Sequence, residues 1–165
     1  MDRTEPLPHP DSQSRLSPVL LWVLIAAVLF RVVTAVMDGK GNEPEGLVRW
    51  QEREKAGSLS RTTGKPILYD FTAAWCAPCH LLDRDWNDSA IAEKVNASFV
   101  PARVVDRRRE DGKNPREVDE LLQRYEITGF PTLVVASTDG RLIGKLEGYS
   151  GRDALVQFLD ESGRK

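Results

Sequence analysis

The chain has 165 residues and a formal net charge of -2, from 23 Lys and Arg against 25 Asp and Glu. This length leaves room for one domain of ordinary size with an appendage and excludes two large domains. Charged residues make up 29% and hydrophobic residues 41% of the sequence, which is too apolar for a wholly disordered chain. The near-neutral balance also argues against a nucleic-acid partner, because proteins that bind nucleic acid usually carry a basic excess.

The N-terminal part divides into a tail, an apolar segment and a tether. Residues 1–17 contain three prolines among polar residues, which predicts a disordered tail. From Val19 to Met37, 17 of 19 residues are apolar, about the length of a helix that crosses a bilayer. Residues 18–37 are therefore expected to form a transmembrane anchor, and residues 38–46 a short tether.

Other interpretations of the apolar segment remain open. Its first part also has the length of the apolar core of a secretory signal, with small residues near Ala35 that resemble a cleavage site. A buried helix of a soluble fold is a further alternative, and Arg31 weakens any insertion into lipid. More basic residues follow the segment than precede it, which opposes an exported C-terminus. The topology therefore depends on the chemistry of residues 47–165.

Strand and helix patterns alternate along residues 47–165, which we expect to form one domain. Strands separated by helices predict a parallel core with crossovers, closed by one antiparallel hairpin at Asp139 and Gly140. The expected strands are residues 47–50, 67–71, 99–105, 132–136 and 141–146. The expected helices are residues 51–63, a helix that begins near residue 76, then 89–95, 115–125 and a last helix from residue 150.

Local signals predict how three of these helices begin. Asp88 is a good N-cap, and Asn114 is an N-cap followed by proline at the first helical position. Ser150 and Asp153 match a capping box for the last helix. The mixed charges of residues 107–111 predict a solvated loop.

Only two cysteines occur, Cys76 and Cys79, and they follow an expected buried strand and open a helix. Unpaired backbone N–H groups and the helix dipole stabilise an anion at this position, so they favour a thiolate. Cys76 is therefore the expected nucleophile of disulfide exchange. Cys79, one turn further into the helix and expected to be less exposed, is placed to resolve the mixed disulfide.

Three other interpretations of the pair are open. With His80 the pair spells Cys-x-x-Cys-His, a c-type haem attachment signature, although no Met or His follows to serve as a second axial ligand. The pair could also supply half of an intermolecular zinc site. Finally, it could form an inert disulfide in a redox-silent adaptor, although so small a loop gains little stability from closure. We expect no metal and no cofactor.

These features together resemble the thioredoxin superfamily over about residues 47–162. The resemblance rests on Asp70, which stands six residues before Cys76, and on Trp75, which directly precedes the pair. It also rests on the Gly-Phe-Pro-Thr segment at residues 129–132 and on the order of the elements. It implies an α/β thioredoxin fold, with a central mixed β-sheet flanked by helices, here preceded by a single N-terminal transmembrane helix.

The resemblance also implies roles for individual residues. Pro131 would follow a cis peptide bond beside the cysteine pair, where the preceding backbone binds an incoming chain; an ordinary strand-initiating proline is the alternative. Trp75, Phe130 and Pro131 are thus the expected substrate-binding residues. Asp70 would be the buried acid that assists deprotonation of Cys79, and its position within a buried strand independently predicts a raised pKa. The alternative is that Asp70 caps a loop at the end of the strand.

Departures from thioredoxin itself qualify this resemblance. Ala102 stands near the position at which a lysine partner of the buried acid is expected, so Asp70 is expected to be tuned differently. Other stretches are similar to exported thioredoxin-like domains, including the C-terminal domain of bacterial disulfide-reductase transporters. We therefore expect a thiol:disulfide oxidoreductase anchored in the inner membrane and facing the periplasm or the extracellular space. Its expected partners are protein thiol or disulfide substrates and a protein that donates or accepts electrons.

Overall fold

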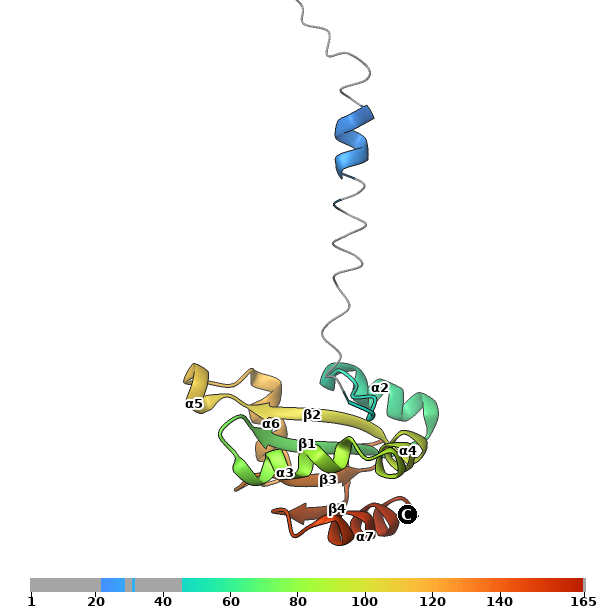
Figure 1. The fold of residues 1–165 in the computed structure, drawn as a ribbon, viewed down its shortest axis with the longest axis vertical. Coiled ribbons are helices and arrows are strands. Elements are labelled where there is room, and N and C mark those ends of the chain that lie inside the picture. The colour runs from blue at the N-terminus through green and yellow to red at the C-terminus, as the bar shows by residue number, and fades with distance from the viewer. Residues whose placement is uncertain (1–21, 29–30, 32–45, 165) are drawn as a thin grey trace, which may run out of the picture. The chain divides into compact units, whose positions relative to one another are not determined.

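The computed structural model describes residues 22–28, 31 and 46–164 (Figure 1). Its contacts divide the chain into two units, residues 1–42 and residues 43–165. In the first unit, residues 22–28 are helical and their side chains are exposed. Among the described residues, no helix is both long enough and apolar enough to cross a membrane. Most of the predicted anchor, together with the predicted tail and nearly all of the tether, lies outside the described residues.

The second unit is built on a four-stranded mixed sheet with the strand order β2-β1-β3-β4 (Figure 1). β1 (Ile67–Ala73) pairs in parallel with β2 (Val100–Asp106) on one side. On its other side β1 pairs antiparallel with β3 (Thr132–Ala136), which pairs antiparallel with β4 (Leu142–Glu147). The central strand that leads to the cysteine pair is therefore hydrogen-bonded along both edges.

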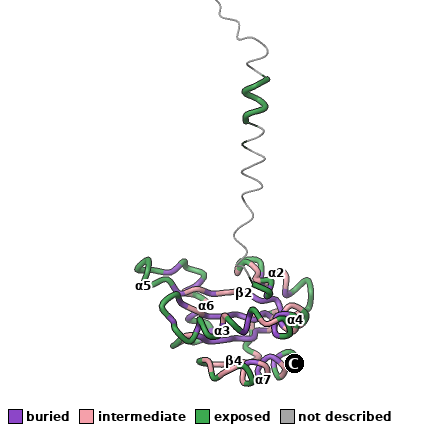
Figure 2. Tube along the Cα trace, in the orientation of Figure 1, coloured by how far each residue is buried: buried purple, intermediate pink, exposed green. Residues whose placement is uncertain are grey.

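Helices flank this sheet on both faces. The structure has α2 (Arg53–Thr63), α3 (Ala77–Trp86), α4 (Ser89–Ser98), α5 (Arg108–Asp111), α6 (Arg116–Arg124) and α7 (Arg152–Ser162). Residues of α3, α4 and α7 share one apolar cluster with Leu68 and Leu133 of the sheet. Residues of α2 and α6 share another with Tyr69 and Val134. β1, β2 and β3 therefore lie between two cores and are buried along most of their length, whereas β4 at the edge of the sheet is only partly buried (Figure 2).

The period of two along β1 decides which core each of its side chains enters. Ile67, Tyr69 and Phe71 belong to the cluster with α2 and α6. Leu68 belongs to the cluster with α3, and Asp70 bonds to the side chain of Trp86 at the end of α3. The only carboxylate of β1 is thereby directed toward the helix that the cysteine pair opens.

The expected mixed sheet flanked by helices is confirmed, but fewer strands are parallel than the sequence pattern predicted. Only β1 and β2 are parallel, because residues 125–131 between α6 and β3 reverse the chain before it returns to the sheet. An alternation of strand and helix patterns does not determine strand direction when a connection has room to turn. The expected loop at residues 107–111 is also partly wrong, since it contains the short helix α5.

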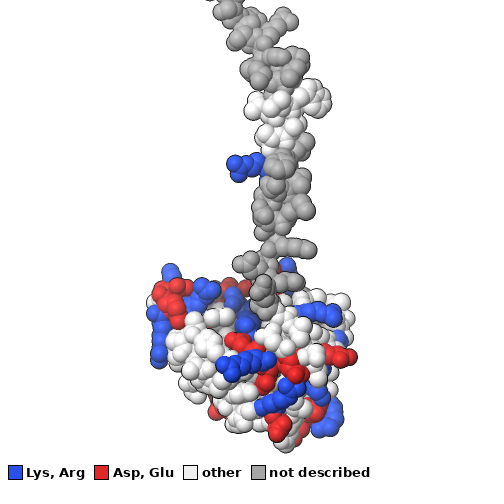
Figure 3. Space-filling model, viewed as in Figure 1, with Lys and Arg blue, Asp and Glu red and all other residues white. Residues whose placement is uncertain are grey.

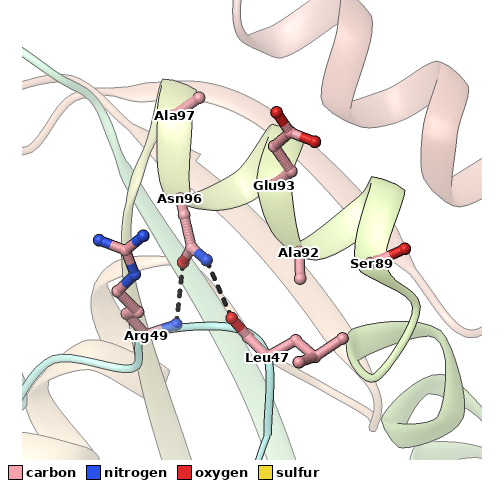
Figure 4. A pocket seen from close by; sticks show the side chains of 7 residues that line it. All are labelled: Leu47, Arg49, Ser89, Ala92, Glu93, Asn96 and Ala97. Atoms are coloured by element: carbon pink, nitrogen blue, oxygen red, sulfur yellow. Dashed lines mark hydrogen bonds between the residues drawn. The ribbon is translucent and has the colours of Figure 1, made fainter.

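The strand expected at residues 47–50 does not form. The sheet contact of this region is a single bridge between Gln51 and Ala102. The backbone of the segment is instead bonded to one side chain of α4: Asn96 accepts from the Arg49 N–H at 2.8 Å and donates to the Leu47 carbonyl at 2.9 Å (Figure 4). This amide satisfies backbone groups that a strand partner would otherwise have to satisfy.

Of the three expected helix caps, one is confirmed. Asp88 accepts from the backbone N–H groups of Ala90 and Ile91. Asn114 does not cap α6, because its amide donates to the buried carboxylate of Asp106 and its oxygen accepts from the Arg107 N–H. The capping box at Ser150 is also wrong: Gly151 is the N-cap of α7, and it has no side chain with which to form a cap hydrogen bond.

The contact between β4 and α7 requires glycine at position 144. A Cβ added there would lie 2.7 Å from Ser162 Oγ and 3.2 Å from a ring carbon of Phe158. We expect Gly144→Val to lower the free energy of unfolding by about 1 to 3 kcal/mol, because the added methyl groups overfill this contact. Gly57→Ala is the matched control, since its Cβ meets only Arg61 at 3.5 Å in the middle of α2.

The control should raise the free energy of unfolding by about 0.5 to 1 kcal/mol, because alanine loses less backbone entropy than glycine in a helix. Urea denaturation of the three proteins measures both effects. A Gly144→Val variant as stable as the parent would contradict the close approach of α7 to β4.

Candidate active site

The two cysteines form a disulfide at the point where β1 ends and α3 begins. Cys76 is the N-cap of α3, and its sulfur accepts a hydrogen bond from the Cys79 backbone N–H at 3.2 Å. This donor and the start of the helix both stabilise negative charge on the Cys76 sulfur when the pair is reduced. The local structure therefore favours Cys76 as the thiolate of the pair.

The expectation that Cys76 is more exposed than Cys79 is wrong in this disulfide-bonded form. Their exposed fractions are 2% and 3%, so both side chains are buried. They form a small apolar cluster with Ala73, and Phe130 packs against it. The assignment of Cys76 as nucleophile thus depends on the hydrogen-bond donor and the helix start, and exposure adds nothing to it.

Of the three predicted substrate-binding residues, Phe130 packs against the disulfide, Trp75 directly precedes Cys76 and Pro131 directly follows Phe130. The Phe130–Pro131 peptide bond is cis, as the resemblance implies. Trp75 remains 43% exposed, and its ring meets the ring of Phe130 edge to face with centroids 5.9 Å apart. Pro131 is buried, and its carbonyl accepts from the Gly148 N–H at 2.8 Å. An exposed aromatic surface therefore adjoins the buried pair, and its role in binding substrate stays a prediction.

Asp70 is 1% exposed, and the hydrogen bonds to its carboxylate converge on one oxygen. Oδ2 accepts from Trp86 Nε1 at 3.1 Å and from Arg103 Nε at 3.2 Å, whereas Oδ1 has no partner. Burial raises the pKa of Asp70 to about 6, although Arg103 opposes this rise. The raised pKa predicted for this carboxylate is confirmed, and burial is its main cause.

Arg103 is the residue of this site that the sequence interpretation missed. In the parallel register Asp70 lies opposite Arg103, and neighbouring residues of a sheet in register point to the same face. Ala102, where a basic partner was sought, faces the other core. An arginine within an apolar strand pattern was the signal that could have identified this partner.

Arg103 also connects the buried acid to the surface. Its Nη2 atom lies 2.7 Å from Asp83 Oδ1 on α3, and its guanidinium lies over the ring of Trp50, 4.5 Å from the ring centre. The side chain is 24% exposed. One arginine therefore bridges a buried and a partly exposed carboxylate.

His80, the third residue of the haem-attachment signature, is turned to the backbone. Its Nε2 atom lies 3.1 Å from the Ala74 carbonyl, which can only accept a hydrogen bond, so Nε2 carries the proton. The disulfide uses both sulfur atoms that thioether bonds to haem would need. The residues as arranged here do not fit a haem site.

The expected loop at residues 107–111 contributes a side chain to the site. The guanidinium carbon of Arg109, in α5, lies 3.6 Å from the centre of the Trp75 ring. This distance is van der Waals contact and makes a cation–π interaction. The sequence pattern gave no indication that this charge would meet the aromatic residue next to Cys76.

The raised pKa makes stability depend on pH with a definite sign. Folded Asp70 holds its proton to about pH 6, whereas the unfolded chain releases it near 3.8, so the free energy of unfolding falls as the pH rises through this window. At neutral pH the cost is on the order of 3 kcal/mol. Asp70→Asn removes it, so the stability of the variant relative to the parent should rise between about pH 4 and pH 7.

Urea denaturation of the oxidised proteins across this pH range measures the effect. Asp70→Ala is the control, because it also removes the titrating group but leaves Arg103 Nε and Trp86 Nε1 without an acceptor. It should show the same trend with pH at a lower overall stability. A stability difference that does not change with pH would contradict the raised pKa.

Comparisons with known proteins agree with this site and fold. The chain is 26% identical over 104 residues to thioredoxin Y2 of Arabidopsis thaliana chloroplasts, an alignment that covers 63% of this chain and 55% of the relative. It is 29% identical over 102 residues to the thiol:disulfide interchange protein DsbD of Campylobacter jejuni, covering 61% of this chain and 17% of that one. The chain thus spans about half the length of one relative and a small part of the other.

Among solved structures, the oxidoreductase DsbH superposes with a TM-score of 0.61 at 23% identity, covering 71% of this chain and 85% of that one. This likeness supports the fold. The family model of the thioredoxin-like domain matches residues 54–163, about two thirds of the chain. That segment contains the disulfide, the buried acid and the cis-proline, and by this match the chain belongs to the thioredoxin-like domain family.

Proposed function

We propose that this protein is a thiol:disulfide oxidoreductase that exchanges disulfides with protein substrates. The observation that carries the proposal is the disulfide between Cys76 and Cys79 at the N-terminus of α3. A helix start whose backbone N–H donates a hydrogen bond to one sulfur stabilises the thiolate at that sulfur, which makes it a good leaving group and attacking group. One relative, DsbD of Campylobacter jejuni, is named as a thiol:disulfide interchange protein, which supports the same chemistry.

The exchange proceeds in two balanced steps. In the reducing direction, the Cys76 thiolate attacks a substrate disulfide, which breaks that S–S bond, releases one substrate thiolate and leaves Cys76 joined to the substrate. The Cys79 thiolate then attacks the Cys76 sulfur, closing the Cys76–Cys79 disulfide and releasing the second substrate thiolate. Two protein thiols are oxidised and one substrate disulfide is reduced, and the oxidising direction is the reverse.

Asp70 is proposed to accept the proton that Cys79 must lose before the second step. Its pKa of about 6 allows this carboxylate to be mostly ionised at neutral pH and still to return a proton readily. The unpartnered Oδ1 atom leaves one oxygen of the carboxylate available for a proton or a water molecule. Arg103, which bonds Oδ2, holds the carboxylate in position and keeps its pKa from rising further.

The substrate segment around the reacting cysteine is proposed to bind beside the pair. It would contact the exposed ring of Trp75, the ring of Phe130 and the backbone before Pro131. Extended peptides add to such backbone through main-chain hydrogen bonds, while neighbouring side chains supply apolar contact. Trp75 and Phe130 offer an aromatic surface directly beside the pair. The proposed partners are therefore proteins with accessible thiols or disulfides, together with a protein that restores the redox state of the pair.

We further propose that residues 18–37 anchor the protein in the inner membrane and that residues 47–165 face the periplasm. The run of apolar residues from Val19 to Met37 supports an anchor. Similarity to a bacterial thiol:disulfide interchange protein supports an oxidising compartment.

The order of the two sulfur steps is tested by trapping. Reduced Cys79→Ser, mixed with a disulfide-containing protein such as insulin, should accumulate a covalent adduct through Cys76, because the resolving thiol is missing. Cys76→Ser should form little adduct, since the favoured thiolate is gone. Non-reducing electrophoresis followed by mass spectrometry of the linked peptides identifies the sulfur that carries the adduct.

Two results would count against this proposal. An adduct that formed through Cys79 in preference to Cys76 would reverse the roles of the cysteines. A disulfide in the wild-type protein that no mild thiol reductant opens, as judged by titration of its thiols, would favour a redox-silent adaptor instead.

The topology is tested with reporters fused after Lys165 and expressed in a bacterium. Alkaline phosphatase, which needs disulfides formed outside the cytoplasm, should be active in this fusion, and a fluorescent protein that fails to mature after export should be dark. A fusion that lacks residues 18–37 is the control and should reverse both signals. Active fluorescent protein in the full-length fusion would overturn the proposed orientation and support the count of basic residues.

A further inference from the structure

The contact between Arg109 and Trp75 lies directly beside the cysteine pair. Trp75 precedes Cys76 in the chain, and its ring meets Phe130, which packs on the disulfide. Arg109 lies over the ring of Trp75 with its guanidinium carbon 3.6 Å from the ring centre. A positive charge is therefore held over the aromatic surface that we propose to receive the substrate.

Arg109 differs from the other arginines of its segment in its partners. Arg107 is paired with Asp111, and Arg108 with Asp119. Arg109 makes no ion pair with any carboxylate in the part of the chain that the structure describes, and its side chain is exposed. Its charge is thus uncompensated at short range, whereas the charges of its two neighbours are balanced.

The mixed charges around α5 bear on how the charge of Arg109 could select a partner. On the face shown in Figure 3, Lys and Arg are interspersed with Asp and Glu, and both signs gather at the end that carries α5. The domain therefore offers no broad basic field on this face to attract an acidic partner. Selection by charge would have to come from a single positioned group rather than from net charge.

Stacking leaves most of the hydrogen-bonding capacity of the guanidinium unused. A planar guanidinium meets an aromatic ring with its face, while its N–H groups point outward along its edge. Two of these N–H groups match the two oxygens of a carboxylate. The ring of Trp75 thus holds the arginine in place and leaves its edge free to bind a carboxylate of an approaching chain.

We propose that Arg109 is a specificity-determining residue that favours protein substrates with an Asp or Glu side chain next to the cysteine that exchanges with Cys76. This inference rests on the proposed disulfide exchange and adds to it the chemical class of the preferred substrate. The carboxylate takes no part in bond making or breaking. It binds the Arg109 edge while Cys76 attacks the neighbouring sulfur.

The test uses three synthetic peptides that differ only in the residues flanking one cysteine, which are Glu, Gln or Lys. The cysteine of each peptide carries a neutral thiopyridyl group through a disulfide, so the leaving group adds no charge of its own. Attack by reduced Cys76 on the peptide sulfur releases pyridine-2-thione, which is followed by its absorbance. Cys79 then closes the disulfide and releases the peptide thiol.

For the full-length protein at low salt we expect the Glu peptide to react about twofold to fivefold faster than the Lys peptide, the range of a solvent-exposed ion pair. Arg109→Gln should bring the ratio of Glu to Lys rates close to one, because the charge that distinguishes the two peptides is gone. Arg109→Lys should give an intermediate ratio, because the charge remains but the planar guanidinium is lost. Lys113→Gln is the matched control, since it removes an exposed positive charge from the same connection. It should keep the parental ratio.

The Gln peptide separates failure of this inference from failure of the proposed function. If reduced wild-type protein does not react with the Gln peptide, the proposed disulfide exchange itself fails. If all three peptides react and the ratio of Glu to Lys rates is the same in wild type and Arg109→Gln, the role of Arg109 is overturned. A ratio that falls equally in Lys113→Gln would also overturn it, because general charge rather than the stacked arginine would then be the cause.

Discussion

The ion pair between buried Asp70 and partly exposed Arg103 is the interaction on which the active-site region depends. A carboxylate in a nearly solvent-free core is costly to ionise, and it is tolerated here because a guanidinium and an indole N–H meet the same oxygen. These donors come from β2 and from the end of α3, so the acid joins the sheet to the helix that carries the cysteines. Burial of the carboxylate outweighs the opposing effect of Arg103, so the pKa of Asp70 is raised to about 6.

The sheet positions this acid and the disulfide together. β1 lies between β2 and β3 and is hydrogen-bonded on both edges. Its C-terminal end is therefore held firmly where α3 begins. The cis-proline segment reaches the same place from the start of β3. Elements far apart in the chain thus converge on two sulfur atoms.

Patterns that act over short distances along the chain predicted most of the fold. Strands at residues 67–71, 99–105 and 132–136 and the cap at Asp88 were recognisable because alternation, apolar runs and capping residues are local signals. Asn114 and residues 47–50 were misjudged because their polar groups bond to distant residues, Asp106 and Asn96, that no local pattern connects.

The same difference between local patterns and contacts between distant residues explains which residues of the site could be predicted. Cys76, Cys79 and Asp70 stand out by spacing, whereas Arg103 depends on the register between two strands, and Arg109 on where a short helix folds back. A shift of one position between Ala102 and Arg103 changes the face of the sheet, so a partner sought by position alone was placed in the wrong core.

The two hydrogen bonds between the Asn96 side chain and the backbone of residues 47 and 49 have a mechanical consequence. A force applied to the domain from its N-terminal side acts on these two hydrogen bonds before it acts on the hydrogen bond from the Gln51 N–H to the Pro101 carbonyl. Both anchor points, α4 and the edge strand β2, lie outside the central strand that leads to the disulfide. Tension on the chain from this side therefore meets α4 and the edge strand β2 before it reaches the central strand that leads to the two sulfur atoms.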